Sequence, residues 1–277
     1  MKPNFWNRLA GAGLAALLAL TVSGAAEAQQ WVSRHGMTSA QYQSWFDTYK
    51  AQGYRLTDID AYSVGGKGYY AAVWSKTGSG AWVARHGLQA PAYQQTFDNL
   101  TAKGYAPAFI DAMSLGSGLF AGFWQKSGGA WVARHGLSGQ KYQQEFNKWV
   151  GQGYRLVDVS GYSVNGQARY AAIWKKQGGS AWQARHGMSS ASYQQTFDAM
   201  KAQGYRPVHV DGYTVNGKPY FAAIWDKGRG GWVARHGMSG SQYQAEFDKW
   251  AAQGYRLVDV SGYEAGGKAR YAAIWHR

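Results

Sequence analysis

Aromatic and aliphatic side chains recur along this chain at spacings that alternate between those of helices and those of strands. In one representative stretch, Tyr142, Phe146 and Trp149 stand at positions i, i+4 and i+7, so they would share one side of a helix. Two runs of residues that favour β-structure follow, and Asn165-Gly166 separates them. An Asn-Gly pair between two such runs is a strong signal for a tight β-hairpin. The stretch therefore predicts a helix followed by two antiparallel strands.

The predicted helix has recognisable ends, and a third strand precedes it. Ser138 suits the N-cap, and Gly153 suits the position just after the last turn. Upstream, a β-rich segment carries the motif Trp-x-x-Arg-His-Gly, whose glycine permits a sharp turn into the helix. Together these signals predict a unit with the order strand, helix, strand, strand.

The whole pattern occurs five times. The Arg of the motif stands at 34, 85, 134, 185 and 235, and a period of about 50 residues indicates one supersecondary unit copied along the chain. We therefore expect an α+β repeat protein in which residues 29–277 form a single domain of five β-α-β-β units. Their approximate boundaries are 31–81, 82–130, 131–181, 182–231 and 232–277.

The order of the strands leaves two ways to join the units. If the last strand of each unit pairs with the first strand of the next, Trp31–Arg34 would pair with Tyr271–Trp275 and close a five-bladed, propeller-like ring. In element order only, such a ring resembles the α/β propellers called penteins, whose catalytic cysteine is absent here. The alternative is an open curved stack, because the odd copies end their helices in Tyr or Trp and the even copies in Leu or Met.

The N-terminal residues and the net charge bear on where the protein acts. Residues 1–28 combine two basic residues, an apolar run and a final Ala-Glu-Ala, as in a secretory signal peptide cleaved near Ala28. We therefore expect a secreted or periplasmic protein with no membrane span after cleavage. The full chain has a formal net charge of +14, and loss of Lys2, Arg8 and Glu27 with the leader leaves +13. This excess favours anionic partners such as acidic polysaccharides or cell-wall polymers, and nucleic acid is not among the partners that we expect.

The Arg and His of the motif are the candidate binding residues. Neighbouring side chains of a strand point to opposite faces, so the two would not form one joint site. For each Arg we expect a structural role, foremost an ion pair with an Asp in the strand after the helix, or else hydrogen bonds to backbone carbonyls at the turn; the alternative is a row of guanidinium groups that binds anionic ligands. For each His we expect hydrogen bonds that lock the turn; the alternatives are a metal site, a proton-sensitive gate or a catalytic role. The candidate residues are Arg34, Arg85, Arg134, Arg185, Arg235, His35, His86, His135, His186 and His236.

The remaining residue patterns are typical of structure rather than of chemistry. Two rows of Trp flank the loop between units, and we expect core packing, with sugar-binding platforms as the alternative. The sequence contains no cysteine and no His-Glu-x-x-His motif, so we expect no catalytic residue, metal or cofactor. Any function would come from departures between copies, such as Phe109 and His209, which stand where other copies have Asp.

The repeat of Arg-His-Gly, Tyr-Gln, Phe, Gly-Tyr-Arg and Tyr-Ala-Ala-Ile-Trp resembles the tandem repeats of polyglycine hydrolases and related bacterial exported proteins over residues 31–275. In polyglycine hydrolases, such repeats stand beside a β-lactamase-like serine peptidase domain that cleaves Gly-Gly bonds. The resemblance implies the non-catalytic half of such a system. Ser138-Gly-Gln-Lys141 matches the Ser-x-x-Lys motif of that peptidase domain, but Ser138 is the predicted helix cap and the parallel quartets contain no Lys.

Two functions follow as hypotheses. The first is an exported, non-catalytic binding or scaffold module that recognises a glycan, the cell wall, a Gly-rich peptide or another protein. The second is a hydrolase, or an accessory subunit of a β-lactamase-like serine peptidase.

Overall fold

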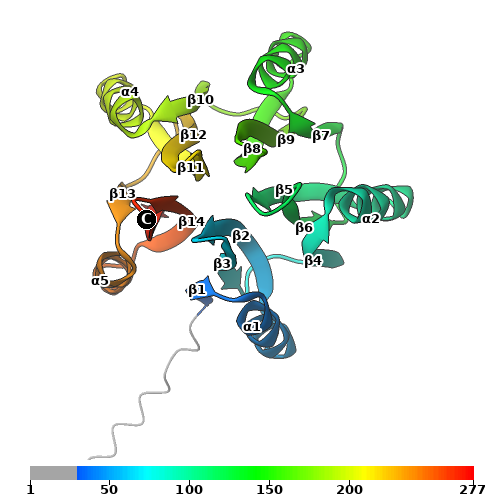
Figure 1. Ribbon diagram of the computed structural model, residues 1–277, viewed down its shortest axis with the longest axis horizontal. Coiled ribbons are helices and arrows are strands. Elements are labelled where there is room, and N and C mark those ends of the chain that lie inside the picture. Colours follow the sequence, from blue (N-terminus) through cyan, green and yellow to red (C-terminus); the bar gives the residue numbers. More distant parts are fainter. Residues whose placement is uncertain (1–29) are drawn as a thin grey trace, which may run out of the picture.

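The computed structural model describes residues 30–277, which fold into five copies of one unit (Figure 1). Each copy contains a strand, a helix and two further strands in that order, as the sequence predicts. The elements are β1 (Trp31–Met37), α1 (Ser39–Ala51), β2 (Arg55–Val64) and β3 (Lys67–Ser75); β4 (Trp82–Gln89), α2 (Ala90–Ala102), β5 (Ala106–Met113) and β6 (Leu119–Gln125); β7 (Trp131–Leu137), α3 (Gly139–Gly151), β8 (Arg155–Val164) and β9 (Gln167–Lys175); β10 (Trp182–Ser189), α4 (Ser190–Ala202), β11 (Arg206–Val215) and β12 (Lys218–Asp226); and β13 (Trp232–Met238), α5 (Gly240–Ala252), β14 (Arg256–Ala265) and β15 (Lys268–His276). The expected signal peptide, residues 1–28, lies outside the described residues.

Local signals set the boundaries of these elements. The backbone N–H of Lys141 donates a hydrogen bond of 3.3 Å to the Ser138 hydroxyl, as expected for the N-cap of α3. Asn165 and Gly166 have φ angles of 51° and 72°, and they connect β8 to β9 in a tight turn. The cap and the hairpin that the sequence predicts are both confirmed.

The helices lie on the outside of the molecule, and each contributes its aromatic stripe to the core (Figure 1). Tyr142 of α3 is 2% exposed, and its ring centroid lies 6.1 Å from that of Trp174 in β9. Trp174 and its four equivalents are all fully buried: Trp74, Trp124, Trp174, Trp225 and Trp275. The helical stripe and this row of Trp are therefore core. None of the described helices is long and apolar enough to cross a membrane.

Each sheet has three antiparallel strands and is confined to one unit. In the first unit the order is β1-β3-β2, and the other four units repeat it. Trp31 pairs with Ser75 of its own unit, so the expected pairing of Trp31–Arg34 with Tyr271–Trp275 is wrong. The physical reason is that the loop after β3 leads the chain into the next sheet instead of turning back as a hairpin. The helix meanwhile returns the chain, so that the first and last strands of one unit lie side by side.

The five sheets are arranged around a common centre, with β2, β5, β8, β11 and β14 innermost (Figure 1). The buried apolar clusters of the described residues lie between neighbouring units, and one of them combines residues of the fifth and first units. The hydroxyls of Tyr62 and Tyr271 lie 2.7 Å apart at that junction. The same contact, also 2.7 Å, joins Tyr170 to Tyr213 between the third and fourth units. The first and fifth units thus contact each other in the manner of consecutive units.

Glycines on the inner strands allow the units to approach closely. A Cβ atom at Gly161 would lie 2.4 Å from the ring of Tyr213, and one at Gly262 would lie 2.5 Å from the ring of Tyr62. Real Cβ atoms do not come this close to a ring, so any larger residue would push neighbouring units apart. These small residues therefore set the distance between inner strands.

Candidate functional site

The Arg of the motif lies on the outer surface of every unit, and none pairs with an Asp. Each is exposed and donates through Nη1 to the carbonyl oxygen of the residue before it, over 2.7–3.1 Å. The expected Arg–Asp ion pair is therefore wrong. The reason is distance across the sheet: the Arg stands on the outer strand, whereas the Asp stands on the inner strand at the opposite edge.

The surroundings of these Arg residues differ from unit to unit. Arg134 lies 3.5 Å from the carboxylate of Glu145, and Arg235 lies 3.4 Å from that of Glu246. The guanidinium of Arg34 instead stacks on Trp45, 4.6 Å from the ring centroid. Exposed pairs of this kind contribute little to stability. The row of Arg side chains is therefore a solvated surface whose members have unequal partners.

The His of the motif packs against the preceding unit. His86 lies edge-on to Tyr42 and Tyr70 of the first unit, with ring centroids 4.7 and 5.2 Å away. His35 makes the equivalent contacts with Tyr243 and Tyr271 of the fifth unit. Burial lowers the pKa of all five motif His side chains. Each uncharged ring therefore packs between two units. The five rings contact five different helices, so they do not meet at one common site.

The most concentrated chemistry lies on the inner strands, where the sequence suggested only partners for Arg. Six Asp side chains are buried there, each 4–6% exposed: Asp58, Asp60, Asp111, Asp158, Asp211 and Asp259. His209 lies among them. We call these seven residues the axial cluster. The spacing of Asp58 and Asp60, two residues apart on one face of a strand and flanking Ile59, was the signal in the sequence for a shared environment.

The carboxylates of the axial cluster serve as hydrogen-bond acceptors for the neighbouring unit. An inner strand is the edge of its sheet, so its outward backbone N–H groups have no partner strand. The N–H of Ile110 donates to Asp158 at 2.8 Å, and the N–H of Gly161 donates to Asp211 at 2.6 Å. Asp58 accepts in the same way from Val260 of the fifth unit, at 3.0 Å. Each unit therefore satisfies the open edge of the unit before it.

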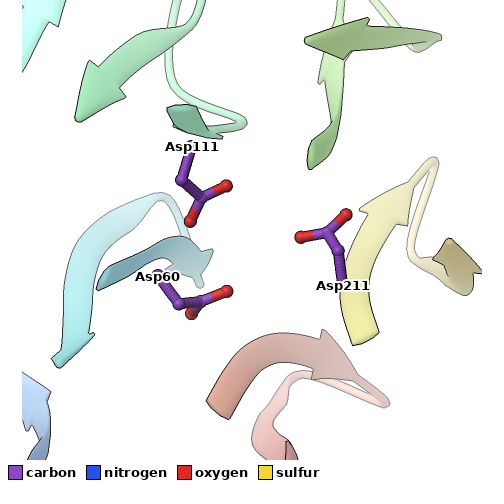
Figure 2. A group of neighbouring side chains, drawn as sticks. All are labelled: Asp60, Asp111 and Asp211. Atoms are coloured by element: carbon purple, nitrogen blue, oxygen red, sulfur yellow. The ribbon is translucent and has the colours of Figure 1, made fainter. Parts of the chain in front are cut away.

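Crowding of these carboxylates has a marked electrostatic consequence. Oxygen atoms of Asp60, Asp111 and Asp211 all lie within 4.8 Å of one another (Figure 2). Burial, followed by repulsion from neighbouring carboxylates, raises the pKa of Asp60 and Asp211 well above the ordinary value. Burial likewise raises the pKa of Asp158, to about 7, although His209 opposes this rise. The cluster therefore holds protons near neutral pH.

His209 is the cationic counterpart within the cluster. Its Nδ1 lies 2.9 Å from Asp259, and its Nε2 lies 2.8 Å from the carbonyl oxygen of Val159. Burial by itself lowers the pKa of His209, but the carboxylates of Asp259 and Asp158 and these two hydrogen bonds leave it well above the ordinary value. The space beside the cluster is about 10 Å³, close to the minimum for one water molecule or ion. Three carboxylates could hold a cation there, but their hydrogen bonds already give them a structural role.

Two larger cavities open where the inner strands begin and the loops between units lie. We call them the first and second end-face cavities. The first has a volume of about 490 Å³ and is lined by residues of the first three units, among them Arg55, Phe109 and Lys175. The second has a volume of about 460 Å³ and is lined by residues of the third and fourth units, among them Arg155 and Arg206. Because Val157 and Gln177 line both, the two cavities adjoin.

Comparison with known families agrees with the repeat seen in the fold. The model of a family described as a polyglycine hydrolase-like structural repeat matches five times, at residues 28–77, 79–127, 128–177, 179–228 and 229–277. No curated protein matches the chain. The matches span almost all of the described residues and coincide with the five β-α-β-β units. The chain therefore belongs to the family of polyglycine hydrolase-like structural repeats, as the sequence resemblance indicated.

Proposed function

We propose that this chain is an exported, non-catalytic binding module whose five units form a closed ring and whose end-face cavities bind an extracellular anionic polymer. The charge of the cavities carries the proposal. Within the part of the chain that the structure describes, Arg55 and Arg155 donate only to uncharged oxygen atoms. Within the described residues, the ammonium of Lys175 makes no hydrogen bond or ion pair. Cations that line a cavity without a carboxylate partner favour an anionic ligand.

Contacts between the first and fifth units support the ring. The N–H of Val260 donates to Asp58, as the N–H of Ile110 donates to Asp158 between the second and third units. A buried apolar cluster spans the same junction. In a closed ring, both sides of every unit would be covered, and the loops between units would gather at one end. That end is where the cavities lie, so ring closure would provide a continuous rim for an extended ligand.

The second candidate is an accessory subunit of a β-lactamase-like peptidase, or a hydrolase in its own right. The description of the family, polyglycine hydrolase-like, favours the accessory role. Catalysis by the axial cluster is not supported, because both ring nitrogens of His209 are engaged and its Asp partner accepts a backbone N–H. The hydroxyl of Ser138 is likewise engaged as the cap of α3.

Polymer binding by residues 29–277 tests the proposal. We expect retention on polygalacturonate at low salt, weaker retention as salt screens the charges, and no turnover of oligoglycine. The double variant Arg155→Ala/Lys175→Ala should elute earlier. Arg85→Ala/Arg185→Ala removes the same charge from the exposed motif row and is the matched control. Absence of retention at any salt would contradict the proposal, as would cleavage of oligoglycine. Equal loss in both double variants would instead assign binding to the general surface charge.

A further inference from the structure

The first end-face cavity exists where the second unit departs from the repeat. Four units begin the inner strand with Arg, at 55, 155, 206 and 256, whereas the second unit has Ala106. The side chain at this position can reach the next unit: Nη2 of Arg55 donates to Gln125 at 2.9 Å, whereas Arg155 and Arg206 donate within their own units. The residue equivalent to Gln125 in the third unit is Lys175. Ala106 therefore removes the side chain that could meet Lys175, and Lys175 faces the cavity instead.

A second departure gives the cavity an apolar wall. Phe109 stands where three units have a buried Asp, and it lines the cavity beside Phe123. The two ring centroids lie 5.8 Å apart, and the ring planes meet at 46°. The guanidinium of Arg55 lies 5.6 Å from the Phe123 centroid. One unit thus places an aromatic face between two cations at a position where other units have a carboxylate.

The polar groups of the cavity have unused hydrogen-bonding capacity. Within the described residues, the exposed amide of Gln177 makes no hydrogen bond, and the ammonium of Lys175 makes no hydrogen bond or ion pair. Burial lowers the pKa of Lys175, and the nearby carboxyl of Asp158 opposes this only in part. An anion in the cavity would supply the missing partner for the ammonium. An amide, two cations and an aromatic face together suit a ligand with a carboxylate, hydroxyl groups and one apolar side.

We infer that the first end-face cavity is a binding site for a uronate residue of an acidic polysaccharide, with Lys175 and Arg55 on its carboxylate, Gln177 on its hydroxyls and Phe109 against the face of its ring. This deepens the proposed function and rests on it. A polymer fits better than a free small molecule, because the adjoining second cavity carries Arg155 along the same rim, and Arg206 lies there in an ion pair with Asp226. Successive uronates of one chain would then meet successive cations.

Titration calorimetry of residues 29–277 with trigalacturonate tests the site. The methyl ester of the same trimer keeps the sugar rings and hydroxyls but removes the charge, so we expect it to bind at least about tenfold more weakly. Lys175→Gln should raise the Kd for trigalacturonate by about tenfold or more. Lys176→Gln, next in the chain but exposed, is the matched control and should leave the Kd nearly unchanged.

A second variant tests the aromatic wall and guards against misfolding. Phe109→Leu keeps an apolar side chain and adds no carboxylate to the axial cluster, but it removes the aromatic face, and we expect it to raise the Kd for trigalacturonate several-fold. Equal Kd values for wild type, Lys175→Gln and Phe109→Leu would overturn the site while leaving polymer binding elsewhere intact. Binding of triglycine through its C-terminal carboxylate, with loss in Lys175→Gln and no binding of trigalacturonate, would overturn the sugar assignment. Failure of wild type to bind any polymer would overturn the proposed function itself.

Discussion

The outer strand of each unit carries the same Arg-His-Gly in all five copies, whereas the inner strand changes at the position of Asp58, which is Phe109 in the second unit and His209 in the fourth. Outer residues meet solvent or the preceding unit, so the same motif can recur in every copy although the partners of its Arg differ. Inner residues meet one another around the common centre (Figure 1). Five identical carboxylates there would repel one another in a buried space, and a repeat protein must vary at such positions.

The composition of the axial cluster follows this rule at two levels. At the level of Asp58, three copies keep Asp, and Phe109 and His209 replace it in the others. At the level of Asp60, three copies again keep Asp, and Ser160 and Ser261 replace it. The Ser side chains still accept backbone N–H groups, at 3.1 and 2.9 Å, without a charge. We therefore expect functional residues at the centre and the end face, where the copies differ, and not in the outer motif.

The largest effect should come from removing a shared acceptor of the axial cluster. Asp111 accepts from the N–H groups of Ala61 and Ala112 and from the hydroxyl of Ser160. Because Asp111→Ala leaves buried donors without partners, we expect the free energy of unfolding to fall by about 2–5 kcal/mol. Urea denaturation measures it. Asp98→Ala, on the exposed side of α2, is the control and should cost less than about 0.5 kcal/mol. If the two variants lower the free energy of unfolding by similar amounts, inner and outer positions do not differ in their contribution to stability.

The contribution of the axial cluster to stability should fall as the pH rises. The raised pKa of Asp158, about 7 against 3.8 unfolded, means that its ionisation destabilises the fold progressively between about pH 4 and 7. The pKa of His209 is raised above 6.5, so its stabilising contribution is complete below that pH and is lost as the pH rises through the folded value. The five motif His side chains, whose pKa burial lowers, act in the opposite direction, so thermal melts of wild type and a cluster variant are compared at about pH 5.5 and pH 9. His209→Gln should destabilise more at the lower pH; an equal deficit at both would show that His209 is not a buried cation.

A smaller effect distinguishes a ring from an open stack. Tyr271→Phe removes the hydroxyl that bonds Tyr62 between the fifth and first units. Tyr170→Phe removes the equivalent hydroxyl between the third and fourth units. In a closed ring both substitutions should cost about 1 kcal/mol, because both hydroxyls are buried and paired. If Tyr271→Phe costs nothing in urea denaturation while Tyr170→Phe does, the first and fifth units are apart in solution.

The smallest effect should come from the uniform outer motif. Arg134→Ala removes an exposed guanidinium that pairs with Glu145 at 3.5 Å. The guanidinium is partly exposed although Glu145 is buried, and Glu145 keeps Lys141 and Trp149 as partners, so we expect a change in Tm of no more than a few degrees. Differential scanning calorimetry measures it, with Lys175→Ala as a comparison at the end face. A fall of several kcal/mol in the free energy of unfolding would show that Arg134 has the structural role that the sequence suggested.

Much of each unit was predictable from its own sequence, because the signals act within a few residues. The helical stripe of Tyr142, the cap at Ser138 and the turn at Asn165-Gly166 all depend on neighbours along the chain. The candidate site was predictable only in part. Phe109 and His209 were recognisable as departures, and both proved to lie at the centre or the end face. Ala106 and Lys175 were also recognisable as departures from the repeat. Their joint effect appears only when a position in one unit is compared with a position in the next.

The sequence by itself therefore determined the period, the element order and the apolar faces, since these follow from residue spacing and local backbone preferences. Only the tertiary structure decided which strand lies in the middle of each sheet, which group accepts each edge N–H, and what meets around the centre. Those choices join residues about 50 positions apart or at opposite ends of the chain, such as Asp58 and Val260. A contact of that kind leaves no mark on local spacing, because it depends on how whole units pack, and packing follows from the shapes of buried surfaces.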